Sequence, residues 1–171
     1  PIKYTATITS PLSLKLRANS LIDLSVVAQG GITESRLYIS GYPLADINVD
    51  FSSALDWSLV IGGIDTGAYK SFVHNLSTAP GSGTYSLFVP RSSTDTKVVV
   101  CLGASDLASV NLTCSGGYTL TQGDAGLSQV TIDSNLYWKI DGLSGTGAIS
   151  YTVQSPTPTP TVTTETIDPL L

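Results

Sequence analysis

The sequence is poor in the residues on which most enzymes depend. Its 171 residues include one histidine, two cysteines and no methionine, and charged residues make up 12%, about half of the roughly 25% that is usual in globular proteins. Two cysteines without neighbouring histidines fall short of the four ligands of a structural zinc site. We therefore expect a surface of neutral hydroxyl and amide groups, a core that folds without metal or cofactor, and no enzymatic activity.

Basic residues are also few and scattered. The eight Lys and Arg occur singly from Lys3 to Lys139, and the net charge is −5. Without a basic stripe the chain has nothing to neutralise phosphates, which argues against nucleic acids and anionic membranes as partners. Mean hydropathy is +0.23, yet no apolar run approaches the roughly 20 residues of a membrane-spanning helix. We therefore expect no membrane insertion.

The cysteines and the first residue bear on cellular location. The chain begins with Pro1 and has no initiator methionine, so we expect a processed or partial product. Cys101 and Cys114 lie in a Gly- and Ser-rich stretch, which favours a local disulfide over free thiols or a metal site. Disulfides persist mainly in exported proteins, so an extracellular, cell-surface location is expected.

Alternation of apolar and polar residues is the main structural signal, and it predicts strands with one wet and one dry face. It is clearest at residues 46–51 and 55–61. A turn is expected over residues 62–67, and a single helical turn capped by Ser105 or Asp106 is allowed over 103–110. Further strands are expected at residues 2–9, 12–16, 21–28, 36–40, 69–76, 84–89, 97–102, 118–121, 127–132, 136–141 and 148–153.

Residues 75–89 read Asn-Leu-Ser-Thr-Ala-Pro-Gly-Ser-Gly-Thr-Tyr-Ser-Leu-Phe-Val. They resemble the closing hairpin of bacterial and archaeal immunoglobulin-like surface modules, in which a Pro-Gly turn precedes a Thr-Tyr-x-Leu-x-Val strand. The resemblance implies that Trp57 is the core tryptophan of a middle strand and that Tyr85 lies near the start of a late strand. Residues 98–151 are loosely similar to modules of long repetitive surface proteins. Such a resemblance concerns the fold and not an activity.

We therefore predict an all-β, immunoglobulin-like antiparallel β-sandwich of one or two modules. Residues 1–91 form the sandwich, with an N-terminal strand that is available for exchange. Residues 92–154 form either a second small β module or a continuation of the sandwich. Residues 155–171 form an extended Pro/Thr-rich tail of the kind that joins surface domains.

Asp46, Asn48 and Asp50 have the one-three-five oxygen spacing that opens a calcium loop. The EF-hand pattern fails because Phe51 stands where Gly is required and Trp57 where a bidentate Glu is required. The segment is a weak calcium candidate, and the alternative is a solvated strand face. We expect no other cofactor.

Other candidate sites are equally sparse. Asn75 and Asn111 each begin an Asn-x-Ser/Thr triplet and are glycosylation candidates in a host that glycosylates its exported proteins. Trp57 and Trp138 fall on apolar registers, so we expect core packing rather than a sugar-binding platform. His74 has no Gly-x-Ser-x-Gly partner and no selected acid, so we expect a surface or edge residue rather than a catalytic base.

Three features predict a structural subunit of an extracellular filament or surface array. They are an isolated N-terminal strand, a Pro/Thr-rich tail that something is expected to hold, and a surface poor in the Lys and Glu that guard sheet edges. In this hypothesis each molecule donates a strand to the next copy and so forms a homopolymer. The donated residues are Ile2, Tyr4, Ala6 and Ile8, or the segment from Val162 to Ile167. The alternative is a glycan- or protein-binding module of a larger cell-surface adhesin or cell-wall enzyme.

Overall fold

The computed structural model describes residues 12–17, 22–29, 32–49, 57–76 and 84–152. These ranges contain twelve strands and no helix, which confirms the predicted all-β fold. Accordingly, no helix in these ranges has the length and apolar character that crossing a bilayer requires. The expected donor segments and the tail lie outside the described residues.

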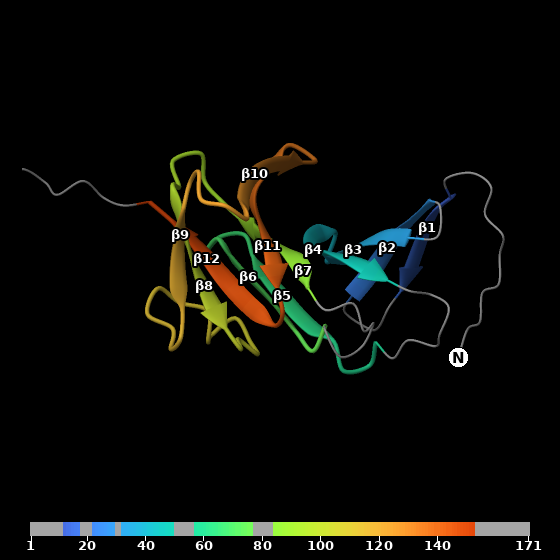
Figure 1. The fold of residues 1–171 in the computed structure, drawn as a ribbon, viewed down its shortest axis with the longest axis horizontal. Coiled ribbons are helices and arrows are strands. Elements are labelled where there is room, and N and C mark those ends of the chain that lie inside the picture. Colours follow the sequence, from blue (N-terminus) through green and yellow to red (C-terminus); the bar gives the residue numbers. More distant parts are fainter. Residues whose placement is uncertain (1–11, 18–21, 30–31, 50–56, 77–83, 153–171) are drawn as a thin grey trace, which may run out of the picture.

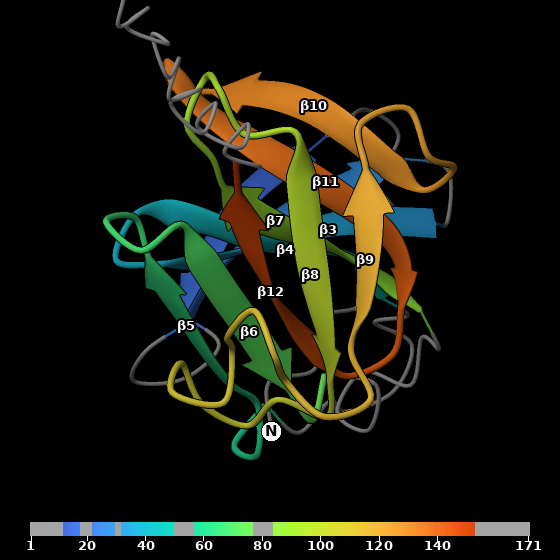
Figure 2. The same ribbon diagram turned by 90° about the vertical axis from the view of Figure 1, so that its left-hand side faces the viewer.

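The strands form two antiparallel sheets, which are arranged as a sandwich (Figures 1 and 2). The seven-stranded sheet has the order β1 (Leu12–Arg17), β2 (Ile22–Gln29), β3 (Ile32–Ile39), β4 (Tyr42–Val49), β7 (Tyr85–Pro90), β11 (Asn135–Leu143) and β10 (Leu127–Ile132). The five-stranded sheet has the order β5 (Ile61–Asp65), β6 (Lys70–His74), β12 (Thr146–Tyr151), β8 (Lys97–Leu102) and β9 (Tyr118–Thr121).

The two sheets overlap only in part. β6 and β12 pack against β7, and β5 packs against β3, β4 and β7. β1 and β2 lie at the end of the molecule away from the five-stranded sheet (Figure 1). The centre of the sandwich is therefore the region around β4, β7 and β11, where both sheets contribute to one layer of apolar side chains.

That layer is the main hydrophobic core. Trp138 on β11 is fully buried, and removing an aromatic side chain of this size from water is among the largest single contributions to folding. Both sheets supply the remaining buried residues, including Leu37, Leu44, Ile47, Val73, Leu87, Val89, Val98, Val100, Ile140 and Ala148. The expectation that Trp138 packs in the core is confirmed.

Strands from the two predicted modules share both sheets. β7 pairs with β11 in one sheet, and β6 pairs with β12 in the other. The ranges 1–91 and 92–154 therefore contribute neighbouring strands to the same core. The last two strands of the larger sheet, β10 and β11, are joined by a two-residue turn in which Asp133 and Ser134 both have positive φ, as type I′ hairpins require.

The predicted turn over residues 62–67 is wrong in position. Gly62 and Gly63 lie within β5, and the turn follows at Thr66–Tyr69. A Cβ atom on Gly62 would lie 2.6 Å from Cδ2 of Leu44, and one on Gly63 would lie 2.6 Å from the ring of Phe72. These glycines permit close packing on both faces of an edge strand.

Three further expectations are corrected. Residues 57–60 do not form a strand, because Val60 N donates to Trp57 O across a turn. Trp57 is half-buried against the main core, so it is not the core tryptophan of a middle strand. Residues 103–110 form bends rather than a helical turn, although the Asp106 carboxylate accepts a hydrogen bond from Ser109 N at 2.7 Å, as a cap would.

Candidate assembly surfaces

Among the described residues, four strands form the edges of the two sheets. These are β1 and β10 in the larger sheet and β5 and β9 in the smaller one. The sequence of β1 includes Lys15 and Arg17, and β5 ends with Asp65, whereas β9 and β10 contain no charged residue. Charged residues discourage pairing with another chain, so β9 and β10 lack this protection. Figure 2 shows β9 running toward the start of β10 on one side of the sandwich.

The pairing of β10 with β11 determines which backbone groups of β10 point outward. Asp141 N donates to Gly126 O at 2.9 Å. Bonded and non-bonded pairs alternate along an antiparallel ladder, so the N–H and C=O groups of Gln129 and Thr131 face away from β11. Among the described residues, no group pairs with them. β10 therefore presents an open edge whose outward residues also have exposed side chains.

The edge of β9 is shorter. Gln122 N donates to Thr96 O at 2.9 Å, so by the same alternation Thr119 and Thr121 point outward. Asp124 engages both outward groups of Thr121, because its N–H donates to Thr121 O at 2.9 Å and its Oδ2 accepts from Thr121 N at 2.7 Å. Asp124 makes no such bonds to the backbone groups of Thr119, the other outward residue.

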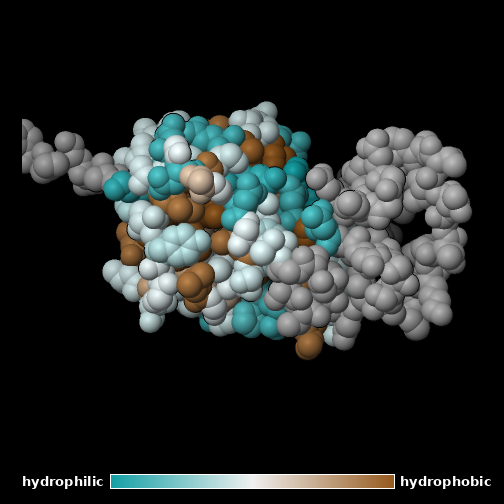
Figure 3. Space-filling model, viewed as in Figure 1, coloured by the Kyte–Doolittle hydropathy of each residue, from teal (hydrophilic) through white to brown (hydrophobic). Residues whose placement is uncertain are grey.

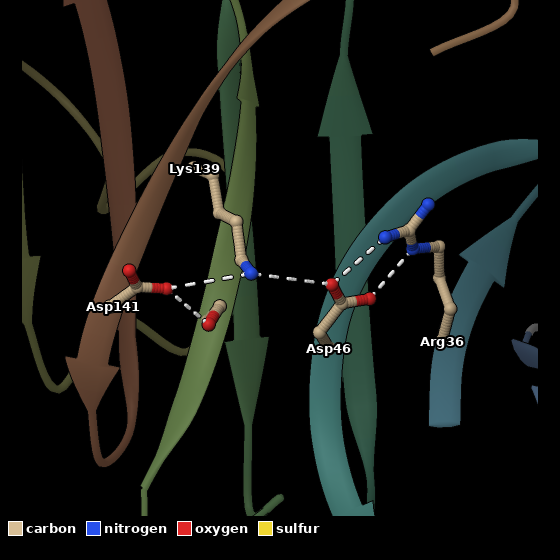
Figure 4. A network of polar contacts seen from close by, with 5 residues as sticks. Arg36, Asp46, Lys139 and Asp141 are labelled. Carbon is tan, nitrogen blue, oxygen red and sulfur yellow. Dashed lines mark hydrogen bonds and ion pairs between the residues drawn. The ribbon is translucent and has the colours of Figure 1, made fainter. Parts of the chain in front are cut away.

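A polar network crosses the outer face of the seven-stranded sheet (Figure 4). Arg36 donates to both carboxylate oxygens of Asp46, at 2.6 and 2.9 Å. Lys139 Nζ lies 3.7 Å from Asp46 and 3.8 Å from Asp141, and Ser86 Oγ also donates to Asp141. The hydrogen bond to Asp46 raises the pKa of the Arg36 guanidinium, although burial opposes this shift.

The network also covers an aromatic side chain. Phe88 lies on the outer face of β7 but is only 1% exposed. The Arg36 guanidinium carbon lies 4.8 Å from the centroid of the Phe88 ring, a cation–π arrangement. Tyr137 meets the same ring edge-on, with centroids 6.4 Å apart. The charged residues of this face therefore shield apolar surface as well as pairing with one another.

The calcium candidates are dispersed. Asp46 contacts two cationic side chains, Arg36 and Lys139, and Asn48 is exposed further along β4. Asp50 lies outside the described residues. Within the described ranges, no three His, Cys, Asp or Glu side chains gather where they could hold a metal ion. A calcium ion at Asp46 would have to compete with both cations.

The connection between β7 and β8 carries a buried polar cluster that its sequence does not suggest. Asp95, 4% exposed, accepts hydrogen bonds from Ser92 N at 2.9 Å and from the hydroxyls of Ser150 and Thr152 at 2.7 Å. The Ser150 hydroxyl also accepts from Nε1 of Trp138 at 3.0 Å. Burial alone would raise the pKa of Asp95, but these hydrogen bonds outweigh it and hold the pKa below its usual value.

Arg91 closes the same cluster from the other side. Its guanidinium carbon lies 4.1 Å from the centroid of the Trp138 ring, and its Nη2 donates to Asp95 O at 2.8 Å. Burial lowers the pKa of Arg91. In the connection between β7 and β8, Arg91 and Asp95 are buried and contact residues of both sheets, whereas Ser93 and Thr94 are exposed.

The predicted disulfide between Cys101 and Cys114 is confirmed, with the two Cα atoms 5.7 Å apart. It closes a loop that folds over the outer face of the five-stranded sheet (Figure 2). Leu107 and Val110 from this loop pack in a cluster with Phe72, and Lys70 Nζ donates to Leu107 O at 2.8 Å. The disulfide therefore holds an apolar cover on this sheet.

Some apolar surface remains outside this cover. Leu102, Leu112 and Tyr118 are exposed, and Figure 3 shows hydrophobic and neutral residues together over the five-stranded sheet. An open depression of about 340 Å³ lies beside the disulfide. Its lining includes Asn111 and Thr113.

The two glycosylation candidates differ in accessibility. Asn111 is exposed, and its Oδ1 accepts hydrogen bonds from both the N–H and the hydroxyl of Thr113, at 2.9 and 3.1 Å. Asn75 is half-buried, and its Nδ2 donates to Leu59 O at 3.1 Å. The side-chain nitrogen that would carry a sugar donates to a backbone carbonyl at both positions, since Asn111 Nδ2 also donates to Ser109 O at 3.4 Å, so the two candidates differ mainly in exposure.

Of the remaining predicted residues, two lie within the described ranges and the others lie outside them. Tyr85 is buried near the start of β7, and its hydroxyl accepts a hydrogen bond from Thr146 N at 2.9 Å. His74 is half-buried on β6, an inner strand of its sheet. The expected subunit-interface residues lie outside the described ranges. They are Ile2, Tyr4, Ala6, Ile8, Val162 and Ile167.

Sequence reasoning did not identify Gln129 and Thr131, or the cluster around Asp95. The uncharged alternating segment Leu-Ser-Gln-Val-Thr-Ile at 127–132 was a usable signal for an unguarded strand. No comparable signal marked Asp95, whose partners come from residues up to 57 positions away. Comparison of the chain with protein-family models, curated protein sequences and solved structures finds no match.

Proposed function

We propose that the protein is a structural subunit of an extracellular filament or surface array, in which subunits join by strand donation. Its role in this proposal is mechanical rather than catalytic. The observation that carries the proposal is the uncharged edge of β10, which has no partner among the described strands, together with the uncharged edge of β9 in the smaller sheet. Soluble proteins usually guard such edges, because an open edge is a template for pairing with another chain.

The donor in this proposal is the segment around Ile2, Tyr4, Ala6 and Ile8, which alternates with Lys3, Thr5 and Thr7. An added strand gains a ladder of backbone hydrogen bonds, each worth about 0.5–1.5 kcal/mol net. It also buries alternate apolar side chains, at about 1.5–3 kcal/mol for a fully buried large one. Each subunit carries one donor and one acceptor, so head-to-tail addition continues without closure.

Negative-stain electron microscopy at physiological salt, combined with light scattering across concentration, tests the proposal. Wild-type protein is expected to form regular filaments or sheets. Ile8→Asp is expected to abolish them while leaving a folded monomer, because it places a charge on the apolar side of the donor. Thr7→Asp is the matched control, since it adds the same charge to the polar side. A wild-type protein that stays monomeric at all concentrations contradicts the proposal.

The second candidate is a glycan- or protein-binding module of a larger adhesin or cell-wall enzyme. The observation that favours it is the exposure of Tyr69 and Tyr118, at 37% and 42%, because exposed aromatic rings supply rigid amphipathic contact area. A concentration-independent monomer that binds a polysaccharide, and that loses binding on Tyr118→Ala, would favour this function over assembly.

A further inference from the structure

We propose that the open edge of β10 is the acceptor for residues 2–8 of a second copy of this chain. This inference rests on the proposed function and specifies its interface. The acceptor groups are the outward N–H and C=O groups of Gln129 and Thr131, which have no partner among the described residues.

The other edges are less suited to this role. β1 contains Lys15 and Arg17, and charges on an edge oppose strand addition. β5 has glycine at two of its five positions, which leaves no side chain there for cross-strand contacts. In β9 both outward groups of Thr121 are already bonded to Asp124. β10 is the remaining edge, and it is six residues long.

The side chains of β10 match those of the proposed donor. Val130 and Ile132 are half-buried, and Val130 pairs with Tyr137 in the sheet. A donor strand has a period of two, so one side of residues 2–8 carries Ile2, Tyr4, Ala6 and Ile8. When that side lies beside Val130 and Ile132, the apolar row continues outward from Tyr137. The polar side of the donor then lies beside the exposed side chains of Gln129 and Thr131.

The length of the donor also fits. Seven residues from 2 to 8 compare with six in β10, so one donor covers the acceptor strand. The alternation of the ladder limits the new bonds to the outward residues. A donor that adds there becomes the eighth strand of the larger sheet and continues its order beyond β10.

Proline substitution at an outward position tests the acceptor directly. Thr131→Pro removes an N–H that faces away from β11, so the β10–β11 ladder keeps its bonds. Thr119→Pro is the matched control, because it removes an outward N–H from the other uncharged edge. Light scattering is expected to show that Thr131→Pro raises the concentration needed for polymers by about tenfold or more. Thr119→Pro is expected to leave that concentration unchanged.

A second pair of variants distinguishes the loss of an assembly contact from a local folding defect. Thr131→Lys places a charge on an exposed side chain at the same edge, and Thr119→Lys does so on β9. Both are expected to fold with wild-type thermal midpoints, and only Thr131→Lys is expected to impair assembly. If the Thr131 variants polymerise like wild type while Ile8→Asp does not, strand donation stands and β10 is not the acceptor. If wild type forms no polymers, both proposals fail.

Discussion

Two aspartates of this protein sit at the centre of polar clusters, but in opposite environments. Asp95 is buried between the sheets and receives hydrogen bonds from a backbone N–H and two hydroxyls. Asp46 lies on the outer face of the larger sheet, with its side chain 24% exposed, and pairs with Arg36 and Lys139. Asp95 itself is 4% exposed, so water has little access to its carboxylate, whereas solvent reaches the Asp46 carboxylate and its partners.

This difference decides which cluster supports the fold. A buried hydrogen-bonding group that loses its partner keeps its full desolvation penalty, at about 1–3 kcal/mol for each group. An exposed ion pair gains little over its hydrated parts, at about 0–1 kcal/mol. We therefore infer that the cluster of Asp95 stabilises the sandwich, while the cluster of Asp46 mainly shapes the outer face.

The largest effect is expected for Asp95→Ala. The change leaves Ser92 N and the buried Ser150 hydroxyl without their acceptor, while the exposed Thr152 hydroxyl can bind water, so the free energy of unfolding should fall by about 2–4 kcal/mol. Urea denaturation measures this loss. Ser93→Ala, an exposed position in the same connection, is the control and should change little. A loss below about 1 kcal/mol for Asp95→Ala would place the structural role elsewhere.

Acid is expected to weaken the same cluster. The pKa of Asp95 is lower in the folded protein than its ordinary value, which is about 3.9. Its contribution to stability is therefore complete above about pH 4 and is lost as the pH falls through the depressed folded pKa. Chemical denaturation at a series of pH values follows this loss. Asp95→Asn removes the titrating group, so the part of the acid dependence that persists in this variant belongs to other residues.

The smallest effect is expected for Asp46→Ala. Its carboxylate is bonded by Arg36, but solvent reaches the pair, so the free energy of unfolding should change by about 0–1 kcal/mol. The difference from wild type should shrink further at high salt, because salt screens exposed charges. A loss as large as that of Asp95→Ala would erase the distinction between the two clusters. It would then indicate that the contact between Arg36 and Phe88 also contributes to the free energy of unfolding.

Strand positions were predictable where alternation or a continuous apolar run was bounded by turn residues. The expected bounds of Lys97–Leu102, Tyr118–Thr121 and Leu127–Ile132 agree with the structure. The prediction was wrong at Gly62 and Gly63, because a glycine pair reads as a turn in sequence. In the fold these glycines serve close packing instead. Leu44 and Phe72 pack closely against these glycines. The local sequence cannot reveal such contacts.

The candidate site was only partly predictable for a related reason. That residues 127–132 lack charge is visible in the sequence, but their position at a sheet edge depends on the strand order. β10 pairs with β11 and with no other described strand. Sequence neighbours do not determine such an order, since β7 lies beside β4 and β11 rather than β6 and β8. The outward direction of Gln129 and Thr131 follows from that order.

The sequence by itself determined the all-β class, the local disulfide and the alternating faces of the strands, because these depend on near neighbours and on side-chain period. Only the tertiary structure decided that Asp95 is buried, that Trp138 rather than Trp57 fills the core, and that β10 is an edge strand among the described strands. Each of these depends on contacts between segments far apart in the chain, and such contacts arise when two sheets close on a common core.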